Sequence, residues 1–233
     1  MTERVDKLFS RLGICSRREV LKLVRAGKIT IEERSVKSAQ ERVDPSEIKF
    51  NGEVLDHPDR IATIFYKPEG VVCTRLGDDT IFQYFPSVWN KRRPLVNSAG
   101  RLDKDTTGIL IITDDGDLVH RIISPRYHIP KTYEIEVADP FSGQEPEIFK
   151  SGTLQLADED KPCKPADLEI LTKNTGRLKL YEGRYHQVKK MFYHFNNEVV
   201  KLHRSTIGSL GLGDLKPGEW RDITPEDYRL IGV

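Results

Sequence analysis

The residue types best suited to chemistry lie in one short stretch, GRLDKDTTGILIITDDG, between Gly100 and Gly116. It places an arginine, a lysine, two aspartates and two threonines directly before a run of aliphatic residues. Carboxylates beside cations suit acid–base or nucleophilic catalysis, and carboxylates with hydroxyls also suit calcium binding. The same residues also form ordinary turns, because Asp and Thr side chains hydrogen-bond to nearby backbone. A catalytic loop, a metal loop and a solvated turn are therefore all open.

A calcium loop fits this stretch poorly. Asp103, Asp105 and Asp114 match the first, third and last ligand positions of such a loop. However, the ninth position is Ile111, which has no side-chain oxygen, and the last position normally holds a bidentate glutamate. The three cysteines also lack a CxxC spacing. No metal site is therefore expected.

Two further polar clusters occur at predicted strand ends. EGRYHQVKKMF, at 182–192, combines Gly, Arg, His, Gln and two Lys where a strand gives way to a helix. PKTYEIEV, at 130–137, puts Lys131 and Tyr133 at the start of a strand. Three separated clusters at strand ends suit one shared cleft, which favours a site over three unrelated turns.

The elements that must position these clusters are mainly strands. From Ile61 onward, IATIFYKPEGVVCT predicts a strand, a turn and a second strand, while KTYEIEVA, DLEILT and RLKLYE alternate between polar and apolar residues. YHQVKKMFYHF instead has an apolar face at helical spacing. Strands with interspersed helices and hairpin turns predict an α+β fold with a mixed, mostly antiparallel sheet.

The first part of the chain has a different pattern. Apolar residues recur at helical spacing over 5–12, and Ser16 with Glu19 forms a capping box, which predicts a second helix from Arg17 to near Gly27. Strand-like runs follow at 29–31 and 48–50. The polar segment DHPDR, at 56–60, is typical of a linker. The sequence thus predicts a small domain over 1–58 and a larger one over 59–233.

The charge of the chain is unevenly distributed. The net charge is only +1, yet residues 1–30 contain eight Lys and Arg against three Asp and Glu. Such a local excess is the electrostatic footprint of phosphate binding. The residues predicted to bind such a nucleic-acid partner fall mostly off the apolar face of the second helix: Arg17, Arg18, Lys22 and Arg25.

The overall composition is that of an ordinary soluble protein. Hydrophobic residues make up 37% and charged residues 31%, and no stretch approaches the roughly 18 apolar residues of a membrane span. The charged first residues lack the apolar core of a secretion signal. We expect a cytoplasmic monomer that contacts no membrane.

Two resemblances account for these patterns together. VDKLFSRLGICSRREVLKLVRAGKITI, followed by VDPSEIKFNGEVL, resembles the S4 RNA-binding domain over about the first quarter of the chain. GRLDKDTTGILIITDDG, SPRYHIPKTYEIEV and EGRYHQVKKMF, in this order, resemble the RsuA-type pseudouridine synthases over essentially the whole chain. HRIISPRYH, CKPADLEIL and GRYHQVKKM are most similar to members that modify small-subunit ribosomal RNA.

The second resemblance implies isomerisation of uridine to pseudouridine in ribosomal RNA, either free or in a subunit assembly intermediate, without a cofactor. Asp103 matches the family's catalytic aspartate, which acts as nucleophile at the sugar or as base on its C2′ proton. Lys189, with Lys190 as the alternative, matches its basic partner. Arg101 matches the arginine that fills the space left by the flipped base, and Tyr133 the tyrosine that stacks on it. The last predicted RNA contact is Arg184.

Two other functions are compatible with parts of the sequence. An S4-like unit alone would suit a non-catalytic RNA-binding factor for ribosome assembly, although such a factor has no need of a carboxylate near RNA phosphates. A glycosidase could use Asp103 and Asp105 as its two carboxylates. The S4-like unit argues against a simple sugar substrate.

Overall fold

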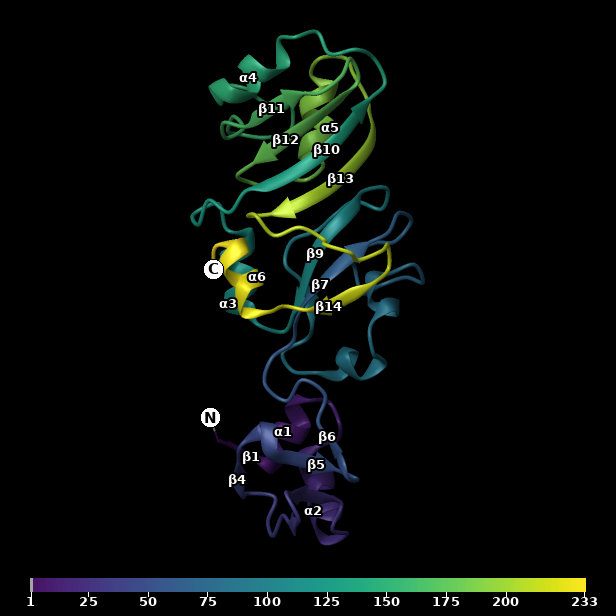
Figure 1. Ribbon diagram of the computed structural model, residues 1–233, viewed down its shortest axis with the longest axis vertical. Coiled ribbons are helices and arrows are strands. Elements are labelled where there is room, and N and C mark those ends of the chain that lie inside the picture. Colours follow the sequence, from purple (N-terminus) through teal and green to yellow (C-terminus); the bar gives the residue numbers. More distant parts are fainter. Residues whose placement is uncertain (1) are drawn as a thin grey trace. The chain divides into compact units, whose positions relative to one another are not determined.

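The computed structural model describes residues 2–233, which form two compact units (Figure 1). The first contains the residues up to Ala62 together with 85–97 and 113–115, and the second contains 63–84, 98–112 and 116–233. The division of the chain into domains at 58 and 59 stays a prediction. No helix of residues 2–233 is long and apolar enough to cross a membrane.

The first unit packs two helices on small sheets. Its elements are β1 (Glu3–Arg4), α1 (Val5–Arg11), α2 (Arg17–Arg25), β2 (Ile29–Ile31), β3 (Arg34–Ser35), β4 (Arg42–Val43), the 3₁₀ helix η1 (Pro45–Glu47), β5 (Ile48–Phe50), β6 (Glu53–Val54) and the 3₁₀ helix η3 (Ser87–Lys91). One sheet has the order β3-β2-β5-β6, and β1 pairs with β4. Both helices and the strands at 29–31 and 48–50 confirm the sequence predictions.

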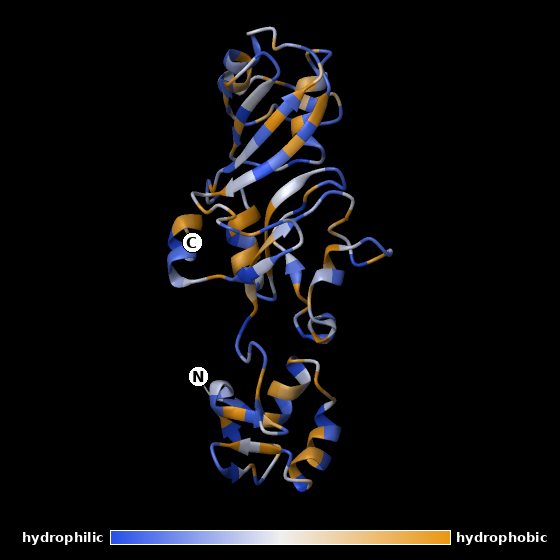
Figure 2. Cartoon of the chain, turned by 45° about the vertical axis from the view of Figure 1, so that its right-hand side comes forward, coloured by the Kyte–Doolittle hydropathy of each residue, from blue (hydrophilic) through white to orange (hydrophobic). Residues whose placement is uncertain are grey.

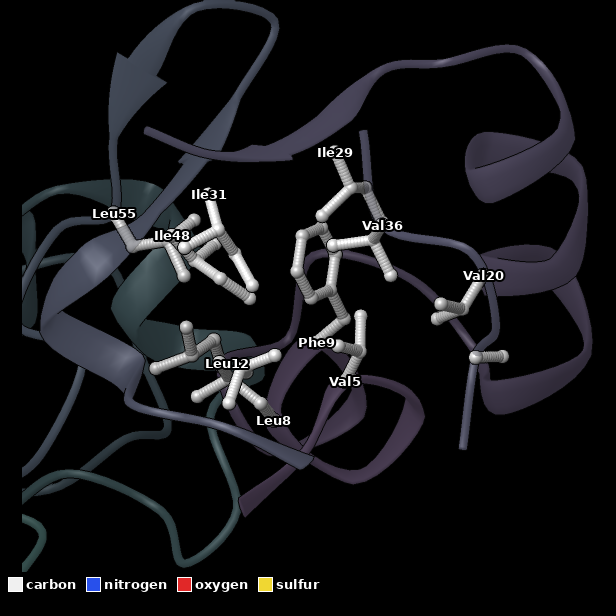
Figure 3. Packing of buried hydrophobic residues seen from close by; sticks show 12 residues of the cluster. Val5, Leu8, Phe9, Leu12, Val20, Ile29, Ile31, Val36, Ile48 and Leu55 are labelled. Carbon is white, nitrogen blue, oxygen red and sulfur yellow. The ribbon is translucent and has the colours of Figure 1, made fainter. Parts of the chain in front are cut away.

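The core of this unit consists of aliphatic side chains from both helices and the sheet around Phe9 (Figure 3). The predicted capping box starts α2: Ser16 accepts from the backbone of Glu19, and the Glu19 carboxylate accepts from the Ser16 backbone. In this way, two backbone amide groups at the start of the helix, which have no acceptor within the helix, are hydrogen-bonded. Because Val20 is the buried residue of α2, the basic side chains of this helix remain exposed.

Arginine side chains hold the segment that the sequence predicts as a linker. Arg11 donates to the carbonyl oxygens of Pro58 and Asp59 at 2.6 Å each. Arg92, which is 2% exposed, donates to the carbonyl of His57 and forms a 3.0 Å ion pair with the buried carboxylate of Asp114. These charge-assisted bonds fix the backbone of 57–59 within the first unit.

The second unit is built on one large sheet. Its elements are β7 (Ala62–Lys67), the 3₁₀ helix η2 (Ile81–Tyr84), β8 (Asn97–Ser98), β9 (Thr107–Thr113), α3 (Gly116–Ile123), β10 (Lys131–Val137), α4 (Glu145–Ser151), β11 (Asp167–Ile170), β12 (Thr175–Leu180), α5 (Gln187–Tyr193), β13 (Val199–Ile207), β14 (Trp220–Asp222) and α6 (Pro225–Ile231). The strand order is β11-β12-β10-β13-β9-β7-β14, and β8 pairs with β9.

The sheet confirms the predicted α+β class. The pairs β11–β12, β12–β10, β10–β13 and β7–β14 are antiparallel, and β13 pairs parallel with β9. Polar and apolar residues alternate along β10, in the part of the sheet where hydrophilic and hydrophobic colours alternate in Figure 2. By contrast, β9 is buried from Gly108 to Thr113. A strand buried on both faces reads as a continuous apolar run.

One predicted strand is absent. The segment after the Pro68-Glu69-Gly70 turn makes only an isolated bridge between Val72 and Thr80. The Val72 amide donates to Asp79 and its carbonyl accepts from Ile81, so a local loop uses both backbone groups. The apolar pair at 71–72 therefore belongs to a loop.

Gly108 fixes where β9 meets β13, and its replacement tests that contact. The residue has a φ of +116°, and an added Cβ would lie 2.2 Å from the Arg204 carbonyl oxygen. We expect Gly108→Ala to lower the free energy of unfolding by about 3 kcal/mol or more, because both strain and backbone overlap oppose it. Urea denaturation followed by circular dichroism would measure this.

Gly116→Ala is the matched control. Gly116 begins α3, and nothing lies within 4 Å of its added Cβ. Alanine in a helix should be neutral or stabilising, by up to about 1 kcal/mol. Equal stability of the two variants would contradict a tight contact at Gly108.

Candidate active site

The loop 100–106 leads into β9 and carries Asp103 at a cavity of the second unit. The carboxylate of Asp103 is 28% exposed. Its Oδ1 lies 3.3 Å from Nε2 of His186, and its Oδ2 lies 3.7 Å from Nζ of Lys189. The structure thus brings two of the three sequence clusters together around one carboxylate.

Lys189 lies between two carboxylates. Its Nζ is 2.7 Å from each carboxylate oxygen of Asp105 and 3.7 Å from Asp103. The sequence predicts a partner for Asp103, and Lys189 is within ion-pair distance of it but bonds more closely to Asp105. Partial burial opposes the charge of Asp105, and the hydrogen bond and positive charge of Lys189 outweigh it, so the pKa of that carboxyl falls below its usual value.

Lys190 points to a different partner. Its Nζ lies 2.5 Å from a carboxylate oxygen of Asp158. Successive helix residues differ in direction by roughly 100°, which separates the two lysines of α5. Lys189, rather than Lys190, is therefore the lysine placed beside Asp103.

A buried lysine that the sequence prediction did not include holds the loop 100–106. Lys67 ends β7, is fully buried, and donates from Nζ to the carbonyl oxygens of Pro68, Lys104 and Thr106 at 3.0, 3.2 and 2.7 Å. Burial lowers the pKa of this lysine, opposed mainly by the nearby Cys73 and by Asp105. The available signal was a lysine directly after three apolar or aromatic residues and before a proline, in IFYKPEG.

A second network shapes the loop 182–187. The buried carboxylate of Glu182 accepts from the Gln187 side chain and the Lys164 backbone, both at 2.9 Å. Arg184, predicted to contact RNA, donates to the carbonyl oxygens of Lys161 and Pro162 and pairs with Glu182. These bonds hold the loop in shape, and the RNA contact of Arg184 stays a prediction.

His186 takes a left-handed backbone conformation, with φ 51° and ψ 31°. This turn directs its ring towards Asp103 while the ring of Tyr185 stacks on it, with centroids 3.8 Å apart. The sequence analysis assigned His186 no catalytic role. Its place beside a charged cluster in GRYHQVK was the signal for a contact with Asp103.

The inner wall of the cavity is made by two adjacent strands. Tyr133 of β10 lies opposite Arg204 of β13, and Lys131 lies two residues before Tyr133 on the same face of β10. All three side chains are at least nine-tenths buried and line a cavity of about 420 Å³. That volume suits one small planar group rather than a folded polymer.

This wall is positively charged. Lys131 donates from Nζ to the carbonyl oxygens of Ile122 and Ile129, and Arg204 donates from Nε to Ile109. Burial, with a smaller contribution from the charge of Arg204, lowers the pKa of Lys131 to about 8. The predicted Arg101 is exposed and lines the rim of the same cavity.

The remaining predicted residues belong to the first unit and are not among the residues that line this cavity. The four basic side chains of α2 are exposed, and the apolar side of the helix faces the core. Within residues 2–233, no group of three or more His, Cys, Asp or Glu side chains is arranged to hold a metal ion.

Comparison with known proteins gives consistent matches to both parts of the chain. Residues 62–194 match the family model described as RNA pseudouridylate synthase, and residues 3–49 match the S4 domain. The ribosomal small subunit pseudouridine synthase A of Yersinia pestis is 38% identical, over 99% of this chain and 98% of its own. The uncharacterized RNA pseudouridine synthase YtzG of Bacillus subtilis (strain 168) is 37% identical, over 98% of each.

A solved structure extends the similarity to the fold. The crystal structure of a pseudouridylate synthase superposes with a TM-score of 0.68 at 37% sequence identity. The match covers 98% of this chain and 99% of that one. The two-part architecture is therefore shared along the full length.

Because Lys131 is buried next to Arg204, we expect it to lose its proton at a lower pH than an ordinary lysine. In ¹³C NMR of protein with labelled lysine Cε, we expect the Lys131 resonance to titrate near pH 8 and to vanish in Lys131→Met. Since the unfolded chain keeps this proton up to about 10.5, the lysine's contribution to the free energy of unfolding should rise with pH between about 8 and 10.5. Titration of Lys131 above pH 10 would show that neither burial nor the charge of Arg204 destabilises its ammonium form.

Proposed function

Because the chain belongs to the RNA pseudouridylate synthase family, we propose that it converts specific uridines of small-subunit ribosomal RNA to pseudouridine. The observation that carries the proposal is the carboxylate of Asp103, held beside Lys189 and His186 at a cavity whose wall contains Tyr133. The naming of the Yersinia pestis relative supports the small subunit as the source of the substrate.

The reaction is an isomerisation that needs no redox cofactor. The N1–C1′ bond of uridine breaks, the uracil turns, and a C5–C1′ bond forms. C5 then loses its proton, and N1 gains one. In our proposal Asp103 acts in its ionised form, as nucleophile at C1′ or as base on the C2′ proton. Lys189 places a positive charge 3.7 Å from one oxygen of this carboxylate.

The target base must leave its stack before it enters the cavity. Flipping a base costs a few kcal/mol. We assign Tyr133 to stack on the flipped uracil, since it is 8% exposed and forms part of the wall. Stacking on an aromatic ring is worth about 1–3 kcal/mol per base and offsets this cost. Arg101, exposed at the rim, is assigned to the space that the base leaves.

The basic face of α2 is the proposed RNA-binding surface outside the cavity. We assign residues 1–58 to the S4-like domain and 59–233 to the catalytic domain. The substrate in this proposal is ribosomal RNA, free or in an assembling subunit, and the enzyme acts as a monomer in the cytoplasm. A non-catalytic assembly factor would bind the same RNA through α2 but would have no use for the arrangement around Asp103.

Asp103 and Asp105 form a matched pair that tests the catalytic assignment. Asp103→Asn removes the ionisable group and keeps its shape, so we expect pseudouridine formation to fall by at least about a thousandfold with RNA affinity within a few-fold. Asp105→Asn should keep most of the activity, because Lys189 can then pair with Asp103 alone. Pseudouridine mapping in small-subunit ribosomal RNA treated with each variant would measure both. A larger loss in Asp105→Asn would show that the wrong carboxylate was assigned.

The salt dependence of binding tests the surface on α2. Replacing Arg17, Arg18, Lys22 and Arg25 with Gln should lower the slope of log K against log salt by about 0.7 for each phosphate that the helix no longer neutralises. Lys201→Gln with Arg229→Gln removes two exposed, ion-paired cations elsewhere and should leave the slope unchanged. Filter binding of a small-subunit ribosomal RNA transcript between about 50 and about 300 mM salt provides the measurement. An unchanged slope in the α2 variant would remove this helix from the RNA interface.

A further inference from the structure

One aromatic side chain at the mouth of the cavity has no role in the proposed reaction. Tyr185 is 66% exposed, whereas Tyr133 in the wall of the same cavity is 8% exposed. Tyr185 nevertheless belongs to the residues that line the cavity. An exposed ring is common on a surface, but this ring lies where a polymer substrate has to pass.

The ring of Tyr185 is held in place by the neighbouring ring of His186. It stacks on His186 with an interplanar angle of 20° and a centroid distance of 3.8 Å. The left-handed backbone of His186 makes this possible, because consecutive side chains otherwise diverge. Glu182 and Gln187 fix the loop on either side of the pair. A stacked ring on a fixed loop loses little side-chain entropy when a second planar group binds to it.

A cation accompanies the ring. Nζ of Lys190 lies over the ring of Tyr185, 5.2 Å from its centroid, and is paired with the exposed carboxylate of Asp158. An aromatic surface next to an ammonium group matches a nucleotide, which offers a planar base and a phosphate on one short unit.

The position of Tyr185 relative to Asp103 indicates which nucleotide would bind. His186 contacts the Asp103 carboxylate through Nε2 and contacts Tyr185 through its ring face. One stacked ring therefore separates Tyr185 from the carboxylate that faces the target sugar. The nucleotide directly before or after the target uridine has to pass through this space.

We propose that Tyr185 is the stacking platform for the base that neighbours the flipped uridine. This inference rests on the proposed function, since it takes the target sugar to lie at Asp103. Every base has a planar face, so stacking alone tolerates many sequences, and purines gain most because their rings overlap Tyr185 more extensively. Tyr185 thus contributes to RNA affinity and to the choice of site.

The test compares Tyr185→Leu with Tyr185→Phe and with Tyr193→Leu. Tyr193 lies in α5, is 79% exposed and is not a cavity residue, so it controls for the loss of an exposed tyrosine. The probe is an unmodified small-subunit ribosomal RNA transcript. Two quantities are measured: the dissociation constant in an Asp103→Asn background, and the enzyme concentration that gives half the maximal single-turnover rate in the active background.

We expect Tyr185→Leu to raise both quantities about 5- to 150-fold, which is the loss of one base stack. Tyr185→Phe keeps the ring and should stay within about threefold of the parent protein, and Tyr193→Leu should match the parent. The rate at saturating enzyme should change much less than the half-saturating concentration, because stacking contributes to binding.

Three results would overturn the proposal. An unchanged dissociation constant in Tyr185→Leu would remove the platform. A fall in the saturating rate and a shifted pH profile, with affinity unchanged, would mean that Tyr185 only positions His186. Equal effects of Tyr185→Leu and Tyr193→Leu would indicate a general surface effect. The dissociation constants need no turnover, so they decide the matter even if the parent protein forms no pseudouridine, which would refute the proposed function separately.

Discussion

The close approach of β9 and β13 is the constraint on which the site depends. At the point where the two strands run parallel, Gly108 pairs with Arg204, and only a residue without a Cβ fits there. The loop 100–106 leads directly into β9, which begins at Thr107, and β13 follows α5 in the chain. The register of this one parallel pair therefore brings the loop of Asp103 against the helix of Lys189. Arg204, at the same pairing, also supplies part of the cavity wall.

The two carboxylates that contact Lys189, those of Asp103 and Asp105, lie in different environments. Asp105 is 61% exposed and accepts both short contacts from the lysine, whereas Asp103 is 28% exposed and keeps the longer one. The ammonium group thus counters the cost of two negative charges close together. Asp103 belongs to the lining of the cavity, and its contacts with His186 and Lys189 limit the directions in which its carboxylate can point.

The local features of the fold were predictable from the sequence, and the non-local ones were not. The capping box of Ser16 and Glu19, the alternation of β10 and the apolar face of α5 each depend on neighbours within a few residues. The strand expected after Gly70 was wrong because a loop closing at Asp79 satisfies the backbone of Val72. The resemblance placed Asp103 and Lys189 in one site. It gave no hint that Lys189 would bond more closely to Asp105, since that depends on the conformation of the loop.

Lys67 illustrates why the burial of a charged side chain cannot be predicted from a local sequence pattern. A lysine at a strand end normally indicates solvent, yet this one is buried and satisfied by three carbonyl oxygens. Its acceptors lie up to 39 residues away along the chain, beyond any local pattern. Lys67 holds the loop that carries Asp103, and Lys131 and Arg204 line the same cavity as Asp103, so three buried cations surround this site in the second unit. A positive interior offsets the repulsion between Asp103 and the phosphates of an approaching RNA strand. It also favours a base that carries negative charge as its bond to the sugar breaks, so the same buried groups that fix the loop make the cavity electrostatically suited to that step.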